Sequence, residues 1–339
     1  MNKLRLSLPP SMRLATLTAY TGAQAIALVE QPLPQPGPGE VLVKVVAAPI
    51  NPSDQMFLLG SYGSRRPLPT GLGFEGSGVV VAAGAGVQAR ALLGRRVAFA
   101  ANERGGTWAD YSLAYASMCV PLLPGVSTVR GSMLLVNPLT AWALVDIARK
   151  QSPAIVQTAA AGTLGHMVQR LAKRYSIPVI NIVRRPEQRD LLHKQGATYV
   201  LDSSAADFDK QLHDLSRQLK ARVVFEAVAG ATTGRILAGM PGGSQAIVYG
   251  ALSLERLNIE PGEFVFRDQR VSGFWLSSWL GQVSPVTLLR AGILAQRLLN
   301  SDLASSVRAC LPLEQIHKAL ALYAGDMTGG KVLLMPAFK

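Results

Sequence analysis

The stretch IVQTAAAGTLG at residues 155–165 decides the fold: a short apolar run leads into a turn of small residues, and helical spacing follows. Small residues let a backbone approach a pyrophosphate, and the start of a helix offers N–H groups at the positive end of its dipole. The pattern indicates a strand, turn and helix that bind a dinucleotide. Ala160 and Thr163 stand where the usual fingerprint has glycines. Because only Gly162 and Gly165 remain, an ordinary strand-to-helix turn is the alternative.

The second strand of this unit bears on the identity of the cofactor. The apolar run Val179–Val183 ends about 20 residues after the turn, where an acidic residue binds the ribose hydroxyls of NAD. Arg184 and Arg185 stand there instead. Two guanidinium groups can hold a 2′-phosphate through charge-assisted, bidentate hydrogen bonds, which predicts NADPH. The alternative is a solvated basic helix start, because Glu187 and Asp190 lie nearby.

Apolar runs and helical segments alternate from about Val126 onward, which is typical of βαβ units in a parallel sheet. The runs are Ile155–Thr158, Val179–Val183, Val223–Ala227 and Ala246–Tyr249. Upstream, short β-branched runs and a Pro- and Gly-rich connector predict a β-rich domain, with strands at 12–20, 41–48, 76–82 and 95–100. A helix over 285–299 and a strand over 331–335 follow later. We therefore predict an α/β fold in three segments, 1–128, 129–272 and 273–339, of which the middle one is the dinucleotide-binding domain.

The composition bounds the class of protein. At 339 residues the chain exceeds the usual size of one core, and its 49% hydrophobic content supports two. No apolar run approaches the roughly 18 residues that a membrane span needs, and we interpret Met1–Pro10 as a short disordered lead. Cys119 and Cys310 are isolated, which predicts no disulfide and no paired metal ligands and fits a cytoplasmic setting. Because the net charge of +13 is dispersed, we expect anionic small molecules as partners, and neither nucleic acid nor membrane.

Five phrases resemble the medium-chain dehydrogenase/reductase superfamily, over a range from about Met12 to Leu334. They are INPSD at 50–54, GFEGSG at 73–78, NPLTAW at 137–142, YGALS at 249–253 and GGK at 329–331. The resemblance implies a GroES-like substrate domain, formed by residues 1–128 and 273–339, and a doubly wound Rossmann domain at 129–272, with the active site between them.

Zinc-containing members of that superfamily hold the metal with a cysteine before a Ser/Thr-Asp pair and with a histidine in a Gly-His-Glu phrase. This sequence has Asn51 and Phe74 at those positions, and it lacks the four-cysteine lobe of a structural zinc. Because tetrahedral zinc sites need their nitrogen and sulfur ligands, we predict that the protein uses no metal. The four histidines fall on predicted helices without ligand-like spacing, at positions 166, 193, 213 and 317.

Two further phrases resemble the mitochondrial-type 2-enoyl thioester reductases, GSYG at 60–63 and GFWLSSW at 273–279. In that family the tyrosine of the first phrase donates a proton, which corresponds to Tyr62, and the Phe-Trp-Leu of the second lies along the nicotinamide. A phenol, with an unperturbed pKa near 10, stays protonated at neutral pH and can protonate the enolate that hydride addition leaves. The alternatives are an ordinary loop aromatic at Tyr62 and core packing for the two tryptophans.

The resemblance implies a set of binding residues. Those expected to contact the cofactor are Asn137, Thr140, Gly162, Thr163, Leu164, Gly165, Arg184, Arg185, Tyr249, Gly250, Ala251, Leu252, Phe274, Trp275, Leu276 and Lys331. Those expected in the substrate pocket are Asn51, Trp275 and Trp279. Thr163 is unusual in the turn, where it either displaces the pyrophosphate or bonds a phosphate oxygen through its hydroxyl.

We therefore expect a zinc-independent, NADPH-dependent reductase of activated C=C bonds, with a 2-enoyl thioester as the favoured substrate and Tyr62 as the proton donor. A quinone or enone oxidoreductase shares the fold, the missing zinc and the NADPH site, and it is the close alternative. A non-catalytic NADPH-binding sensor is the alternative from another class. Members of the superfamily commonly dimerise through the edge strands of their Rossmann sheets, so we also expect a homodimer.

Overall fold

The computed structural model describes residues 8–337 and divides the chain into two compact units. Unit 1 combines Met1–Val136 with Ser305–Lys339, and unit 2 is Asn137–Ala304. Of the predicted lead Met1–Pro10, the first seven residues lie outside the described part. The chain therefore begins unit 1, builds all of unit 2 and then returns to unit 1.

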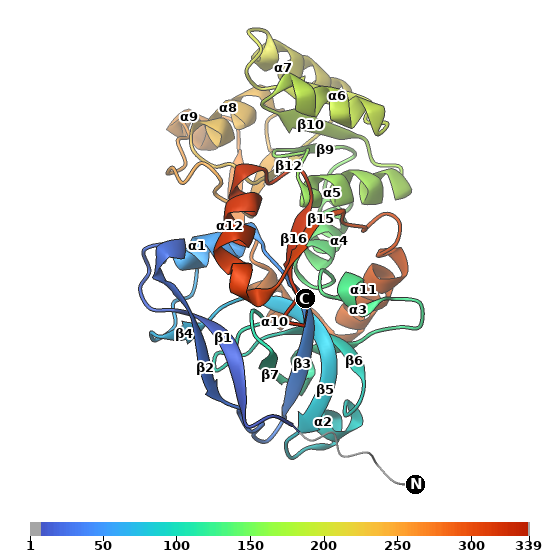
Figure 1. Ribbon diagram of the computed structural model, residues 1–339. Helices are drawn as coiled ribbons and strands as arrows, with labels where there is room; N and C mark the ends of the chain where they lie inside the picture. The colour runs from blue at the N-terminus through green and yellow to red at the C-terminus, as the bar shows by residue number, and fades with distance from the viewer. Residues whose placement is uncertain (1–7, 338–339) are drawn as a thin grey trace. The chain divides into compact units, whose positions relative to one another are not determined.

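Unit 1 is the β-rich unit, drawn in blue and cyan with red carboxyl-terminal elements in Figure 1. Its three-stranded sheet contains β1 (Ser11–Leu17), β2 (Ile26–Pro32) and β4 (Thr70–Gly71), in the order β2-β1-β4. Its seven-stranded sheet contains β3 (Glu40–Pro49), β5 (Glu75–Ala83), β6 (Arg96–Ala100), β7 (Tyr111–Tyr115), β8 (Cys119–Pro121), β15 (Val307–Leu311) and β16 (Lys331–Leu334). The order is β15-β16-β3-β5-β6-β8, and β7 pairs with β3. The helices are α1 (Pro52–Leu58), α2 (Val87–Ala91), α3 (Thr128–Gly131) and α12 (Ile316–Gly325), with short 3-10 turns at Ala23–Ala25, Ala116–Met118 and Leu313–Gln315.

The returning segment completes the second sheet of unit 1. Strand β16 pairs antiparallel with β3, with Leu333 opposite Pro49, and the Ile50 amide donates to the Val332 carbonyl at 3.0 Å. All four residues of β16 are buried, because the strand is apolar on both faces apart from Lys331. This pairing brings Lys331 to the start of helix α1.

Unit 2 is built on a six-stranded parallel sheet with the order β11-β10-β9-β12-β13-β14, which confirms the predicted α/β fold. The strands are β9 (Ile155–Gln157), β10 (Val179–Val183), β11 (Tyr199–Asp202), β12 (Val223–Glu226), β13 (Gln245–Val248) and β14 (Arg270–Gly273). The helices are α4 (Val136–Ala148), α5 (Thr163–Arg174), α6 (Pro186–Lys194), α7 (Phe208–Gln218), α8 (Ala231–Gly239), α9 (Pro261–Val265), α10 (Leu276–Gln282) and α11 (Pro285–Leu298). The four predicted runs are all strands. Strands β11 and β14 were not predicted from the sequence. Both are short, and most of their residues are exposed or half-exposed, which weakens the apolar pattern.

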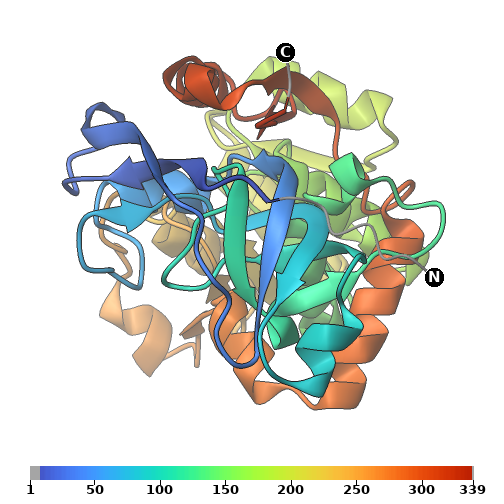
Figure 2. The same cartoon turned by 60° about the horizontal axis from the view of Figure 1, so that its bottom comes forward.

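Residues 273–304 belong to unit 2, whereas the sequence-based segments assigned them to the other domain. The reason is that β14 extends the parallel sheet, with Gly273 opposite Val248, and that α10 and α11 follow it directly (orange in Figure 2). Helix α11 forms where predicted, because the Ser284 hydroxyl caps the Thr287 amide at 3.2 Å and a proline occupies the first turn. Over residues 8–337, the structure contains no helix with both the length and the apolar character of a membrane span.

Candidate cofactor and catalytic sites

The carboxyl ends of the six parallel strands form one edge of unit 2. The strand order reverses direction between β9 and β12, and open α/β sheets bind ligands outside the carboxyl ends at such a point. Most of the predicted cofactor residues lie in the segments that directly follow these strands, either in the loops or in the first turn of the next helix. They are Gly162, Thr163, Leu164, Gly165, Arg184, Arg185, Tyr249, Gly250, Ala251, Leu252, Phe274, Trp275 and Leu276. Asn137 and Thr140 lie on the first turns of α4 in the same unit.

The turn after β9 depends on a close contact at Gly165. A Cβ on Gly165 would lie 2.3 Å from the Ala160 carbonyl oxygen, so only glycine permits this contact between helix and turn. Gly162 precedes α5 without a side-chain cap, which leaves the first amides of the helix available to an anion. Thr163 is the first residue of α5. Ala159 has a φ of 49°, a backbone conformation that non-glycine residues rarely adopt and that is frequent at functional sites.

Arg184 and Arg185 follow β10 with exposed side chains. Neither forms an ion pair within the described residues; on the following helix α6 Asp190 lies 3.8 Å from Arg189 instead. The alternative, a solvated basic helix start, also predicts exposed arginine side chains, so both interpretations fit this arrangement. Two exposed guanidinium groups remain at the place where a 2′-phosphate is expected.

Buried polar side chains form hydrogen bonds behind the carboxyl edge of the sheet, and the sequence analysis did not predict these contacts. The Gln157 amide nitrogen donates to the Gly165 carbonyl at 3.1 Å and to Asn181 Oδ1 at 2.7 Å, which ties the turn to β10. Both side chains are about 1% exposed. A polar residue in a short strand also fits a solvent-facing position, so only the observed pairing of β9 with β10 reveals this contact.

Glu226 ends β12 and is fully buried. Its Oε1 accepts hydrogen bonds from Thr158 Oγ1 at 3.1 Å and from the amides of Val228 at 2.5 Å and Ala229 at 3.1 Å. Burial raises the pKa of this carboxyl, and these three donors oppose the rise. Ala229 has a φ of 67°, so the loops after β9 and β12, on both sides of the switch point, each hold a strained residue.

A buried polar cluster lies in unit 1 where α1 begins. Lys331 Nζ donates to Asn51 Oδ1, and Asn51 Nδ2 donates to Glu75 Oε1 at 3.0 Å. The Asn51 amide of the backbone donates to Asp54 Oδ2 at 2.8 Å. Glu75 Oε2 accepts from the backbone amides of Leu135 and Val136, at 3.1 and 3.0 Å. The ammonium therefore fixes which end of the Asn51 amide is the acceptor, and the amide nitrogen must face Glu75.

The four side chains of this cluster, Asn51, Asp54, Glu75 and Lys331, are each at most 3% exposed. Burial lowers the pKa of Lys331, while the carboxylates of Glu75 and Asp54 oppose that shift. Burial raises the pKa of Glu75, and Lys331 opposes the rise. Burial, together with the charge of Glu75, raises the pKa of Asp54 to about 7. The sequence predicted Asn51 in a substrate pocket and Lys331 at the cofactor, and the structure joins the two residues in one hydrogen-bonded group.

The pH dependence of stability should report on Asp54. Its pKa rises from 3.8 to about 7 on folding, so the folded state holds the proton more tightly, and stability falls as pH rises across that window. The positive charges of Lys331 and Arg66 favour the ionised form of Asp54. The other titratable groups near Asp54 are Glu75 and the Tyr323 phenol. We expect wild type to lose roughly 1 kcal/mol per pH unit relative to Asp54→Asn between pH 5 and 7. Urea unfolding at both pH values measures the difference, and parallel curves for the two proteins would contradict it.

Tyr62 packs in an aromatic group beside this cluster. Its ring centroid lies 4.8 Å from that of Phe74 and 6.5 Å from that of Phe57. The Arg66 guanidinium lies over the rings of Phe57 and Phe74, at 5.7 and 5.8 Å, and burial lowers its pKa. Phe74, which stands where zinc members have a histidine, is thus the surface on which the half-buried Tyr62 rests.

The two tryptophans of the phrase GFWLSSW, Trp275 and Trp279, lie in different environments. Trp275 precedes α10 and is 44% exposed, so it does not belong to a core. Trp279 lies one turn into that helix, 6.5 Å from Phe274 and 5.9 Å from Trp142 of α4. Within residues 8–337, no group of three or more His, Cys, Asp or Glu side chains is arranged to hold a metal ion. The histidines at 166, 193, 213 and 317 lie on helices α5, α6, α7 and α12, as predicted.

Known proteins resemble both units. Residues 37–125 match the alcohol dehydrogenase GroES-like domain, and residues 163–288 match the domain described as zinc-binding dehydrogenase. A solved protein from Mesorhizobium loti that is described as a putative NADPH:quinone reductase is 34% identical, with a TM-score of 0.91, over 98% of this chain and 100% of that one. A mycobacterial protein solved in complex with NADPH is 25% identical, with a TM-score of 0.81, over 96% and 100% of the two chains.

The curated relatives extend the likeness to enoyl reductases. The mitochondrial enoyl-[acyl-carrier-protein] reductase of Arabidopsis thaliana is 29% identical, over 80% of this chain and 74% of the relative. With its GroES-like unit, its parallel-sheet unit and these relatives, the chain is an oxidoreductase of the medium-chain dehydrogenase/reductase superfamily.

Proposed function

We propose that this protein is a zinc-independent, NADPH-dependent reductase of activated C=C bonds, and that a 2-enoyl thioester is its favoured substrate. The observation that carries the proposal is the pairing of Tyr62 with Phe74 beside a buried Asn51 whose amide orientation is fixed. A phenol on an apolar ring and an oriented N–H donor are groups that can serve this reaction without a metal. The enoyl reductases among the relatives support the same choice.

The carboxyl edge of unit 2 fits a phosphorylated dinucleotide. The uncapped start of α5 offers amides to the pyrophosphate, and the close approach at Gly165 keeps the turn compact. Arg184 and Arg185 have no carboxylate partner in the described part of the chain, and in this proposal their guanidinium groups bind the 2′-phosphate. NADPH, when bound, supplies the hydride. In this proposal the protein binds and orients the cofactor at this edge, and residues of unit 1 manage the proton.

Hydride addition to the β-carbon of an enoyl thioester leaves an enolate, which needs stabilisation at oxygen and a proton at the α-carbon. In our proposal the Tyr62 hydroxyl gives its proton to that carbon. Asn51 Nδ2 donates one of its hydrogens to Glu75, and its second hydrogen can donate to the thioester oxygen as negative charge develops there. Lys331 acts through Asn51, because its hydrogen bond holds the amide in the donating orientation.

A substrate panel with NADPH oxidation as the readout tests the proposed function. We expect crotonyl thioesters to be reduced with a higher kcat/KM than simple quinones and enones. A higher kcat/KM with quinones would establish the second candidate, an NADPH:quinone oxidoreductase, which the 34% identity to the Mesorhizobium loti protein favours. Binding of NADPH without oxidation in the presence of any substrate would favour the non-catalytic sensor.

Cofactor preference tests the two arginines. We expect the double variant Arg184→Gln/Arg185→Gln to lower kcat/KM for NADPH about 10- to 100-fold, because charge-assisted bonds to the 2′-phosphate are lost. NADH lacks that phosphate, so its kcat/KM should change little. The matched control is Arg189→Gln, an exposed arginine on the following helix α6 that already pairs with Asp190. Equal use of NADH and NADPH by wild type would refute the assignment.

A further inference from the structure

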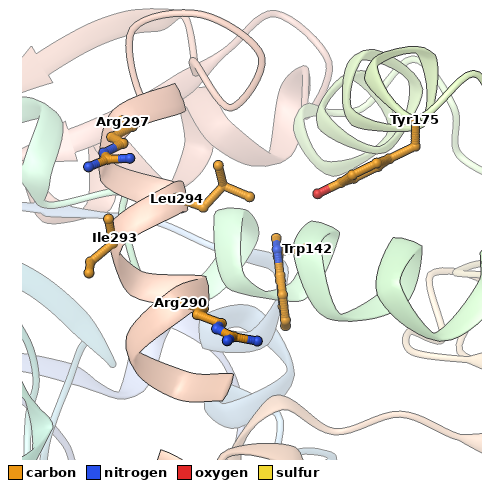
Figure 3. A pocket seen from close by; sticks show the side chains of 6 residues that line it. All are labelled: Trp142, Tyr175, Arg290, Ile293, Leu294 and Arg297. Carbon is orange, nitrogen blue, oxygen red and sulfur yellow. The ribbon is translucent and has the colours of Figure 1, made fainter. Parts of the chain in front are cut away.

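Unit 2 contains a groove of about 400 Å³ that the cofactor edge does not include. It lies between three helices, as Figure 3 shows. Its walls are Trp142 of α4, Tyr175 at the end of α5, and Arg290, Ile293, Leu294 and Arg297 of α11. The groove therefore combines an apolar and aromatic lining with two cations.

The two cations of the groove have no carboxylate partners among residues 8–337. Arg290 and Arg297 are exposed and stand seven residues apart on α11, so they share one face of the helix about 10 Å apart. Neither forms an ion pair with any residue in 8–337, whereas the neighbouring Arg149 and Arg174 pair with Asp146 at 2.5 Å and Asp302 at 3.2 Å. The acids of this region are thus committed elsewhere, and the groove keeps an uncompensated positive charge.

The apolar surface lies between these cations. Ile293 and Leu294 occupy the middle of the helix face, and in Figure 3 the Leu294 side chain points toward the space between Trp142 and Tyr175, while Arg290 reaches toward the Trp142 ring. Trp142 is held in place by an edge-on contact with Trp279, with the centroids 5.9 Å apart. A hydrocarbon chain on this surface would leave water while its charged end stays beside a guanidinium.

The groove is separate from the glycine turn of the proposed cofactor site. Tyr175 follows the last residue of α5, whereas the glycine turn precedes the first. Helix α5 has 12 residues, which places its two ends about 18 Å apart. An anion seated between Arg290 and Tyr175 therefore does not occupy the place of the pyrophosphate.

We propose that this groove is a second binding site, for an amphiphilic anion with a carboxylate and a medium-length hydrocarbon chain. Arg290 binds the carboxylate end, Leu294, Ile293 and Trp142 cover the chain, and Arg297 adds to the positive charge of the groove. The proposal does not depend on the reductase activity, because every residue in it lies outside the carboxyl edge and outside unit 1.

Isothermal titration of the full-length protein with decanoate, below its micelle concentration, tests the proposal, with decanol as the uncharged probe. We expect decanoate to bind at least 10-fold more tightly than decanol, and we expect Arg290→Gln/Arg297→Gln to weaken decanoate binding about 10-fold while decanol binding stays the same. Both side chains are exposed, so the variant should fold normally. Equal binding of the two probes, or unchanged decanoate affinity in the variant, overturns the proposal.

Two controls locate the bound anion. Arg90→Gln removes an exposed helical arginine of unit 1 that forms no ion pair in the described chain, and it should leave decanoate affinity unchanged. The cofactor variant Arg184→Gln/Arg185→Gln should also bind decanoate as wild type does. If that variant alone loses decanoate binding, the anion occupies the cofactor edge and the groove is not the site.

Discussion

Replacing Tyr62 with phenylalanine should lower kcat for enoyl thioester reduction on the order of 10²- to 10⁴-fold, the usual contribution of a positioned proton donor. The ring contacts with Phe74 and Phe57 survive the change, so the aromatic group keeps its shape. Because only the hydroxyl is removed, the affinity for NADPH should stay within about twofold of wild type, well below the effect of a lost charge-assisted bond. Steady-state NADPH oxidation with crotonyl thioester and a separate cofactor titration measure the two quantities.

The matched control for this variant is Tyr115→Phe, which removes a phenol that bonds Glu103 at 2.7 Å on the surface of the same unit. It should leave kcat unchanged. Quinone reduction provides a second comparison, because a reduced quinone takes its protons on oxygen from water and needs no proton at carbon. Full enoyl reductase activity in Tyr62→Phe would assign the proton to another donor and would remove Tyr62 from the mechanism.

Replacing Lys331 with methionine should destabilise the protein by about 3 kcal/mol, because a buried carboxylate then loses its compensating charge. Glu75 keeps its backbone donors but no longer faces an ammonium, and Asn51 loses the bond that orients its amide. Urea unfolding followed by circular dichroism measures the free energy of unfolding. The control is Lys44→Met on the neighbouring strand β3, where the lysine is exposed and the change should cost less than about 0.5 kcal/mol.

A second substitution separates charge from packing at Lys331. If the loss comes from the uncompensated charge of Glu75, the double variant Lys331→Met/Glu75→Gln should recover at least about 1 kcal/mol relative to Lys331→Met alone. A double variant that is no more stable than the single one would show that charge compensation is not what Lys331 provides.

The carboxyl edge of unit 2, where we propose the cofactor binds, could be located from the sequence because its signals are local. Each of its two motifs, the small-residue turn within 155–165 and the arginines after the next strand, follows an apolar run that predicts a strand. Because the carboxyl ends of parallel strands meet at one edge of the sheet, the two motifs are expected to lie together. Glu226 and Gln157 were missed for the opposite reason. A single polar residue in a strand of three or four has no periodicity, so its partner appears only when neighbouring strands are paired.

The buried cluster of unit 1 could not be predicted from residue patterns, since its members come together through pairing that is distant in the chain. Lys331 and Asn51 are 280 residues apart in the sequence and meet because β16 pairs with β3. The phrases INPSD and GGK mark Asn51 and Lys331 by their resemblance to the family. Neither phrase predicts the hydrogen bond between these two side chains. The second domain boundary was misplaced for a related reason, because pairing of β14 with β13 draws residues 273–304 into unit 2.

The return of the chain to unit 1 has a consequence for synthesis on the ribosome. The ribosome synthesises the chain from its amino terminus, and domains generally fold as units. Asn51 and Glu75 therefore leave the ribosome long before Lys331 is synthesised. While unit 2 is being translated, burial of the Glu75 carboxylate would not be compensated by the Lys331 ammonium. The nascent first segment is therefore expected to stay open around α1, and it closes only when the last strand arrives to supply the missing charge.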